Sequence, residues 1–141
     1  MVGYSGTPLA KKLGFKSGTR VSLARLPEEV GAELQDALSE CLREGQKAFD
    51  LVLLFVKTSA ELQEQFPRFA AKLDSSGGLW VAWPKKTSGV RTDLDENRVR
   101  AIGLQNGLVD IKVCAISEIW SGLKFVIRVK DRLQRGRGNK P

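Results

Sequence analysis

The unbroken apolar run at residues 51–56 constrains the fold of this chain more than any other feature. Six residues are far fewer than the roughly 20 that a membrane-spanning helix requires. Short continuous apolar runs are typical of strands whose two faces are both covered by helices, as in a parallel sheet. The run therefore predicts a buried central strand in a protein of the α/β class.

The segments around this strand alternate between strand and helix signals. Pro27 followed by two acids is typical of a helix start, and Thr58 with Glu61 forms a capping box before a second helix, in which Pro67 predicts a kink. Thr92 and Asp95 indicate a second capping box, before a third helix. The expected strands lie at residues 21–26, 51–56, 79–83, 109–114 and 123–129, and the expected helices lie at residues 27–44, 59–73 and 93–105.

This order predicts a Rossmann-like three-layer α/β sandwich with about five strands. Three strand-helix units favour a mostly parallel sheet, and the last two strands, separated by a short loop at residues 117–122, favour an antiparallel hairpin. We expect the last strand to lie between the third and the fourth. The residues 75–78, Ser-Ser-Gly-Gly, predict a turn before the third strand.

The length of 141 residues fits one domain, which we place at residues 20–129. A basic segment at residues 1–19 precedes it, and a flexible basic tail at residues 130–141 follows it. A composition of 42% hydrophobic and 28% charged residues is ordinary for a globular protein. The chain begins without the apolar stretch of a secretory signal, so we expect a cytoplasmic protein with no membrane partner.

The absence of histidine excludes several kinds of chemistry. A Ser-His-Asp or Cys-His nucleophile cannot form, and Cys41 and Cys114 alone cannot hold zinc, so no metal and no catalytic residue is predicted. Cys41 is expected on the apolar face of the first helix and Cys114 in a strand. Both are interpreted as reduced core residues.

The net charge of +7 lies in the two ends of the chain. Residues 1–27 hold five bases and no acid, residues 129–141 hold five bases and one acid, and the remainder holds 13 bases against 15 acids. This asymmetry points to an anionic small molecule, an acidic macromolecule or nucleic acid as the partner, or else serves only solubility.

Ligands of open α/β sheets bind outside the carboxyl ends of the strands, where residues 27–29, 57–59 and 83–92 are expected. The last of these segments carries cations and hydroxyls ahead of a helix start, which favours an anion site, although a solvated loop is the simpler interpretation. The main hypothesis is a non-enzymatic binder of an anionic ligand at this edge. Its candidate residues are Trp83, Lys85, Lys86, Thr87, Ser88, Gly89 and Arg91, joined by Lys11 and Lys12.

The turn after the first strand argues against an adenine cofactor, so none is predicted. Such a site favours a glycine-rich turn, whereas this chain has Leu26-Pro27-Glu28-Glu29. Proline lacks an N–H group, and two carboxylates repel a phosphate. A different hypothesis is a nucleic-acid accessory protein that uses its basic ends, with Arg132, Arg135, Arg137 and Lys140 as the contacts.

Three stretches of this chain resemble a bacterial family of small uncharacterised proteins, the domain of unknown function 3052. They are residues 3–14 with Tyr-Ser-Gly-Thr-Pro-Leu, residues 83–86 (Trp-Pro-Lys-Lys) with 88–89, and residues 107–115 with 120–126. The resemblance extends to about residue 131. It implies a bacterial origin and an intracellular setting, and it implies no particular reaction.

A looser likeness concerns architecture. Residues 49–54, the helix that follows and residues 73–81 are similar to the back half of a class I methyltransferase, and the closing hairpin fits as well. The glycine-rich cofactor turn and the acid after the second strand are missing. The likeness implies a trimmed relative, so a degenerate methyltransferase-like enzyme is the alternative hypothesis.

Overall fold

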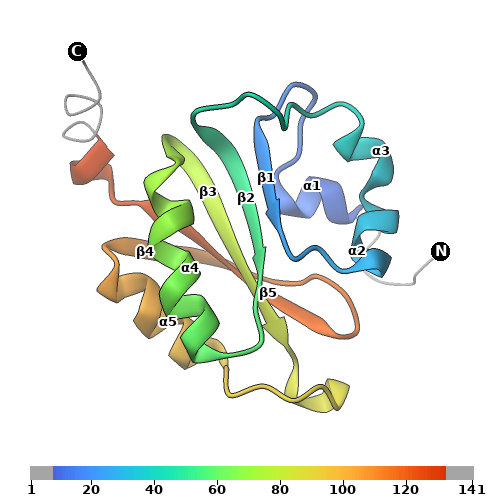
Figure 1. Cartoon of the computed structure of the whole chain (residues 1–141), viewed down its shortest axis with the longest axis vertical. Coiled ribbons are helices and arrows are strands. Elements are labelled where there is room, and N and C mark those ends of the chain that lie inside the picture. The colour runs from blue at the N-terminus through green and yellow to red at the C-terminus, as the bar shows by residue number, and fades with distance from the viewer. Residues whose placement is uncertain (1–7, 133–141) are drawn as a thin grey trace.

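A five-stranded sheet with helices on both faces organises residues 8–132, the part of the 141-residue chain that this computed structural model describes (Figure 1). The strands are β1 (Val21–Ala24), β2 (Phe49–Phe55), β3 (Leu73–Pro84), β4 (Leu108–Ala115) and β5 (Trp120–Ile127). The helices are α1 (Leu9–Leu13), α2 (Glu28–Glu33), α3 (Gln35–Leu38), α4 (Ser59–Ala71) and α5 (Glu96–Gln105), with a single 3-10 turn at Lys86–Ser88.

The order of the strands in the sheet is β1-β2-β3-β5-β4. β1, β2 and β3 are parallel, and β5 runs antiparallel to both of its neighbours. The predicted α/β fold, the strand number and the position of the last strand are therefore confirmed. The buried apolar run also lies where it was expected, since β2 has a strand on each side and helices on both faces.

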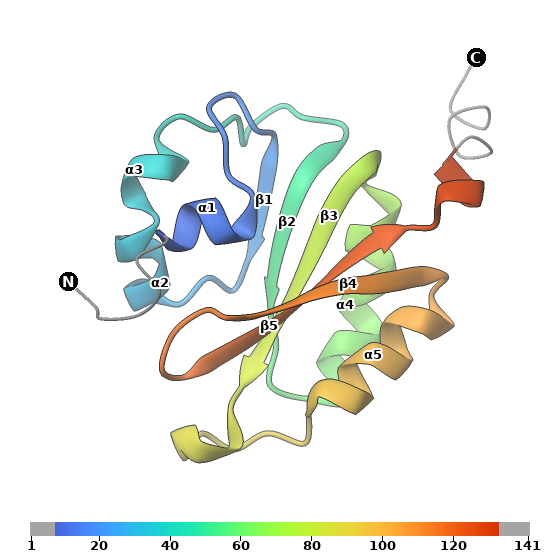
Figure 2. The same cartoon turned by 180° about the vertical axis from the view of Figure 1, so that it is seen from behind.

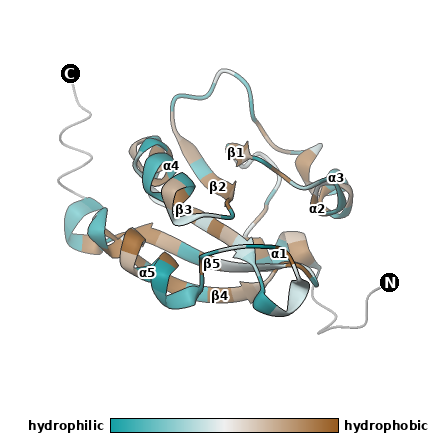
Figure 3. Cartoon of the chain, turned by 60° about the horizontal axis from the view of Figure 1, so that its bottom comes forward, coloured by the Kyte–Doolittle hydropathy of each residue, from teal (hydrophilic) through white to brown (hydrophobic). Residues whose placement is uncertain are grey.

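Two groups of helices cover the two faces of the sheet. Figure 2 shows α4 and α5 on one side and α1, α2 and α3 on the other. Trp80 and Trp83 lie three apart in β3 and belong to the two different core clusters, as their spacing predicts. Figure 3 shows hydrophilic residues on the outer surfaces of α4 and α5, while apolar residues lie toward the sheet.

The strand β3 begins earlier than predicted, because residues 75–78 continue the strand rather than form a turn. The pairing of β3 with β2 is irregular here: Leu73 opposes Phe49, and the next pair is Gly78 with Leu51. Gly77 lies against β2 so closely that a Cβ atom would come within 2.8 Å of the Phe49 carbonyl oxygen. Gly77, one of the two glycines that suggested a turn, is needed for this close approach.

The predicted helix at residues 27–44 is wrong in its length, because it divides into α2 and α3 at Leu34. Beyond α3 the chain pairs with β1 instead of continuing as helix. The N–H of Leu42 donates to the Thr19 carbonyl oxygen at 2.8 Å, and the N–H of Val21 donates to the Leu42 carbonyl oxygen at 2.9 Å. Cys41 consequently lies half-buried outside any helix.

The capping box of α4 is confirmed, and Pro67 lies within this helix without ending it. α5 begins at Glu96, three residues later than predicted. Asp95 is its N-cap and accepts a hydrogen bond from the Arg98 N–H, whereas Asp93 accepts one from the Ser59 N–H at the start of α4. Asp93 therefore joins the two helices instead of lying in the first turn of α5.

The sequence did not predict α1, which packs its buried Leu9 and Leu13 into the same cluster as Trp80. The helix ends at Gly14, whose φ of 97° is in the left-handed region that suits glycine. In residues 8–132, no helix is both long and apolar enough to cross a membrane.

Candidate functional site

The carboxyl ends of β1 and β2 meet the start of β5 at a pocket of about 430 Å³. This volume lies in the usual range for small-molecule sites. Pro27 and Lys57 come from two of the three segments that the sequence places at this edge. The lining residues are Arg25, Pro27, Phe55, Val56, Lys57, Glu61 and Trp120.

Two aromatic rings form one side of this pocket. Phe55 at the end of β2 and Trp120 at the start of β5 pack edge to face, with ring centroids 5.2 Å apart and ring planes at 86°. Both side chains are buried by more than nine-tenths and belong to the core. The wall is therefore rigid and apolar, which suits a planar ligand group.

Glu61 organises the polar side of the pocket. One carboxylate oxygen accepts hydrogen bonds from the N–H groups of Lys57 and Thr58, at 2.9 and 3.2 Å. The other oxygen accepts from a guanidinium nitrogen of Arg25. Glu61 thus connects the start of α4 to the turn that follows β1, and it holds both in place.

Arg25 adopts an unusual backbone conformation in that turn. Its φ is 60°, and among residues 8–132 it is the non-glycine residue with positive φ. An L-residue in this region costs about 1–2 kcal/mol, and such strain gathers at functional sites. The sequence carries no glycine here that could have indicated this conformation.

The predicted anion loop at residues 83–92 is built differently from the expectation. Trp83 is only 5% exposed and packs in the core beneath α4 and α5. Ser88 donates through its hydroxyl to the Lys85 carbonyl oxygen at 2.6 Å, and the Lys85 N–H donates to the Ile119 carbonyl oxygen at 2.7 Å. Lys86, Thr87, Gly89 and Arg91 are exposed.

Of the two lysines that were expected to join this loop, Lys11 is exposed and Lys12 is half-buried on α1. Burial raises the pKa of the Cys114 thiol, and the charges of Lys12, Lys112 and Lys85 oppose this increase. α1 and the loop after β3 therefore approach the same corner of the sheet at Cys114. The assignment of these lysines to a ligand stays a prediction.

The proposed nucleic-acid contacts fall largely beyond this part of the chain. Arg132 donates from its Nε to the Ile127 carbonyl oxygen at 2.8 Å, while Arg135, Arg137 and Lys140 lie outside the described residues. In the described range, no three Cys, Asp or Glu side chains gather as a metal site requires.

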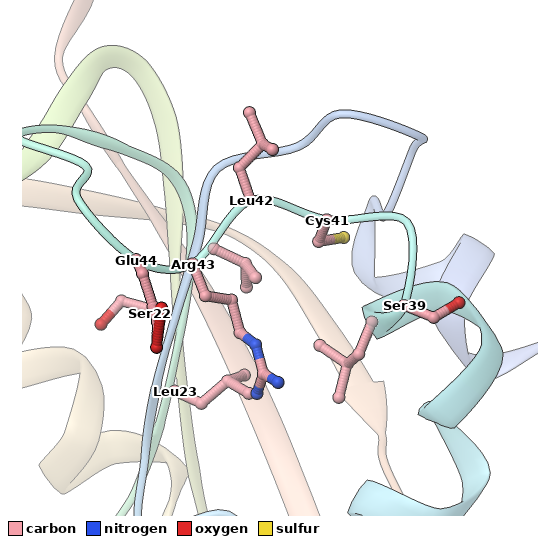
Figure 4. A pocket seen from close by; sticks show the side chains of 9 residues that line it. Ser22, Leu23, Ser39, Cys41, Leu42, Arg43 and Glu44 are labelled. Atoms are coloured by element: carbon pink, nitrogen blue, oxygen red, sulfur yellow. The ribbon is translucent and has the colours of Figure 1, made fainter.

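A larger pocket of about 700 Å³ lies between β1 and the segment 38–44, which begins at the last residue of α3. Figure 4 shows Leu23 of β1 facing the loop that carries Cys41 and Arg43, with Leu42 pointing away. Leu42 is 50% exposed. The pocket is open because β1 is an edge strand of the sheet: within residues 8–132, the neighbour on this side is a single bridge between Leu42 and Arg20, just before β1.

Several solved structures with a similar fold are methyltransferases. Magnesium protoporphyrin IX methyltransferase from Synechocystis PCC 6803 with bound SAH has 14% identity and a TM-score of 0.56, over 85% of this chain and 78% of that chain. A SAM-dependent methyltransferase from Aquifex aeolicus has 12% identity and a TM-score of 0.55, over 85% and 88%. A putative type 11 methyltransferase from Sulfolobus solfataricus has 11% identity and a TM-score of 0.54, over 86% and 90%.

This is the fold of the class I methyltransferases. The looser of the two sequence resemblances is therefore confirmed at the level of fold. No protein-family model and no curated protein sequence matches the chain. The resemblance to the domain of unknown function 3052 accordingly has no support from these comparisons.

The methyltransferase neighbours overturn the main functional hypothesis of a non-enzymatic anion binder, and they favour the alternative. The sequence reasoning treated the cations after β3 as the strongest signal. It gave Glu61 only the role of a helix cap and assigned no role to Trp120. Nothing local in the sequence indicates that Phe55 and Trp120 meet at one pocket.

Proposed function

We propose that this chain is a methyltransferase-like enzyme that binds S-adenosylmethionine at the pocket between Arg25, Phe55 and Trp120. The observation that carries the proposal is the position of this pocket on a class I methyltransferase fold. It lies at the carboxyl ends of two adjacent parallel strands, β1 and β2. Open α/β sheets bind their ligands at this edge.

The turn after β1 is compatible with this ligand, although the sequence analysis argued against it. That argument had three parts: the turn is not rich in glycine, Pro27 lacks an N–H group, and Glu28 and Glu29 repel a phosphate. The third part does not apply to this ligand. S-adenosylmethionine carries no phosphate, and its sulfur is a cation, so carboxylates near the site do not oppose it. The left-handed backbone of Arg25 also supplies the conformation that glycine usually provides.

Each side of the pocket suits one part of this ligand. The edge-to-face rings of Phe55 and Trp120 offer an apolar wall for the adenine. Lys57, which is exposed at the rim, offers a cation for the carboxylate of the methionine moiety. The bound group would supply a methyl on positively charged sulfur, and the chain's own residues would hold and orient it.

Isothermal titration calorimetry with S-adenosylmethionine and S-adenosylhomocysteine tests the proposal. Lys57→Trp places a large ring at the mouth of the pocket and is expected to abolish binding. The matched control is Lys72→Trp, because Lys72 is an exposed lysine at the end of α4, outside the lining residues of this pocket. It is expected to bind like the wild type.

Two results contradict the proposal. Absence of heat with both ligands at millimolar concentration excludes the proposed function. Binding that survives Lys57→Trp with unchanged affinity excludes this pocket as the site. Circular dichroism of each variant confirms that a loss of binding is not a loss of fold.

A further inference from the structure

A second pocket, of about 400 Å³, lies at the amino ends of the parallel strands, away from the proposed cofactor edge. The loop from α1 to β1 forms one wall, and the irregular first half of β3 forms the other. β5 contributes the floor between them. The lining residues are Gly14, Lys16, Ser17, Gly18, Thr19, Asp50, Leu51, Ser76, Gly77, Gly78, Lys124 and Val126.

Glycines keep this pocket open for the side chain of Lys124. A Cβ atom on Gly78 would come within 2.3 Å of the Cε atom of Lys124, and one on Gly14 would come within 3.6 Å of its Nζ atom. A side chain at position 78 would have to move the lysine, whereas a Cβ atom at position 14 would be in ordinary van der Waals contact with it. The two walls therefore fit around the Lys124 side chain as a cradle.

The ammonium group of Lys124 is half-buried and has no acidic partner. Among residues 8–132, no carboxylate lies within ion-pair distance of it. The charge of Lys112 repels it, and the Trp80 ring attracts it, with the ring centroid 6.0 Å from Nζ. Burial and Lys112 together lower the pKa of Lys124.

The one acid that lines the pocket is already neutralised. Asp50 accepts hydrogen bonds from the Arg20 N–H at 2.9 Å, from Arg20 Nε at 3.1 Å and from Arg20 Nη2 at 2.6 Å. Arg20 also lies 3.3 Å from Asp74, which itself accepts from Ser76. Lys16 and Lys124 are the cations that face a ligand in this pocket. Arg20 is shared by Asp50 and Asp74, so that cluster keeps one net negative charge beside them.

We propose that this pocket binds the phosphate group of a small molecule through Lys124 and Lys16. Two ammonium groups supply charge, and the Ser17 hydroxyl supplies a donor at the rim. Gly18, whose Cβ position has no atom within 4 Å, lets a tetrahedral group approach the backbone. The site differs in its residues and its edge from the loop at residues 83–92, and it does not depend on the proposed cofactor site.

The melting temperature of a Lys124 variant distinguishes a ligand-binding lysine from a lysine that stabilises the fold, because removal of the latter lowers the melting temperature. A buried ammonium without an acidic partner costs free energy in the folded protein. Lys124→Met keeps the apolar stem and removes that cost, so this variant is expected to melt at a higher temperature than the wild type. It is also expected to bind phosphate about tenfold or more weakly, because a charged donor is lost.

Titration of ¹⁵N-labelled protein with inorganic phosphate, glycerol 3-phosphate and acetate, followed by NMR, tests the proposal. The amide signals of Gly14, Gly18, Gly77 and Gly78 are expected to shift with phosphate or with the phosphate ester. A shift with inorganic phosphate indicates a free phosphate site, and a shift with the ester alone indicates a phosphorylated metabolite. Both results support the proposal.

Gly78→Ala moves the ammonium without removing it, since the new methyl group occupies the place of Lys124 Cε. This variant is expected to weaken phosphate binding in the same way as Lys124→Met. Lys72→Met removes an exposed charge elsewhere and should bind like the wild type. Unmoved glycine signals, a response to acetate alone, or full binding by Lys124→Met would each overturn the proposal.

Discussion

The indole nitrogen of Trp80 donates a 2.9 Å hydrogen bond to the backbone carbonyl oxygen of Leu13. Trp80 is fully buried in β3, and Leu13 is the last residue of α1. Lys112 supports the same helix end, since its ammonium donates to the Lys12 carbonyl oxygen at 3.1 Å. Carbonyls at a helix end need such partners, so these two bonds hold α1 on the sheet.

Trp80→Phe is expected to destabilise the protein by about 2–3 kcal/mol. The substitution leaves the Leu13 carbonyl oxygen without its donor and opens a small cavity. Urea denaturation measures the change. Trp83→Phe is the control on the other face of the sheet, where the change removes packing alone. Equal losses in the two variants would show that the hydrogen bond of Trp80 contributes nothing.

Arg25→Gly and Arg25→Ala are expected to differ in stability, although both remove the ion pair with Glu61. Alanine keeps the cost of a left-handed backbone at φ 60°, and glycine relieves it. The glycine variant should therefore be more stable than the alanine variant by about 1 kcal/mol. Thermal unfolding of both proteins checks the order, and the reverse order would mean that Arg25 carries no strain.

Gly103→Ala in α5 is expected to destabilise the protein by about 3 kcal/mol, because the core is overpacked. The new methyl group would lie 2.1 Å from Phe125 Cε1, and Phe125 is held edge to face against Phe66 at 5.3 Å. Gly31→Ala in α2 is the control, since its nearest neighbour is the flexible tip of Leu26 at 3.2 Å. A small effect at both positions would show that Phe125 has room to move.

Asp50→Asn is expected to lower the free energy of unfolding at pH 7 by about 1 kcal/mol. The loss is this small because the ion pair between Arg20 and Asp50 is partly exposed to solvent, which screens it. The Arg20 guanidinium lowers the pKa of Asp50 below its usual value. The wild type therefore gains stability from Asp50 above about pH 4 and loses it as the pH falls through the lowered pKa.

Urea midpoints between pH 7 and pH 2 check this expectation. The wild type and Asp50→Asn should converge as the pH falls. Asp131→Asn serves as the control, because Asp131 makes only a 3.9 Å contact with Arg128 at the surface. A gap between the wild type and Asp50→Asn that stays constant down to pH 2 would contradict the lowered pKa.

Local patterns in the sequence determined the five strands, the helices α4 and α5, and the order of these elements. The apolar run of β2 predicted a strand with helices on both faces of the sheet. The capping box of Thr58 and Glu61 marked the start of α4. These signals depend on residues a few positions apart, so short-range propensity and periodicity suffice to read them. Even the place of β5 between β3 and β4 followed from the order of the elements.

Only the tertiary structure decided where a ligand could bind. Phe55 meets Trp120, Arg25 meets Glu61 and Gly78 makes room for Lys124, although each pair is far apart in the chain. The same contacts override local signals: the glycines at residues 77 and 78 form part of a strand, and Arg25 takes a glycine-like conformation. Such outcomes depend on packing energies between distant segments, which no short stretch of sequence contains.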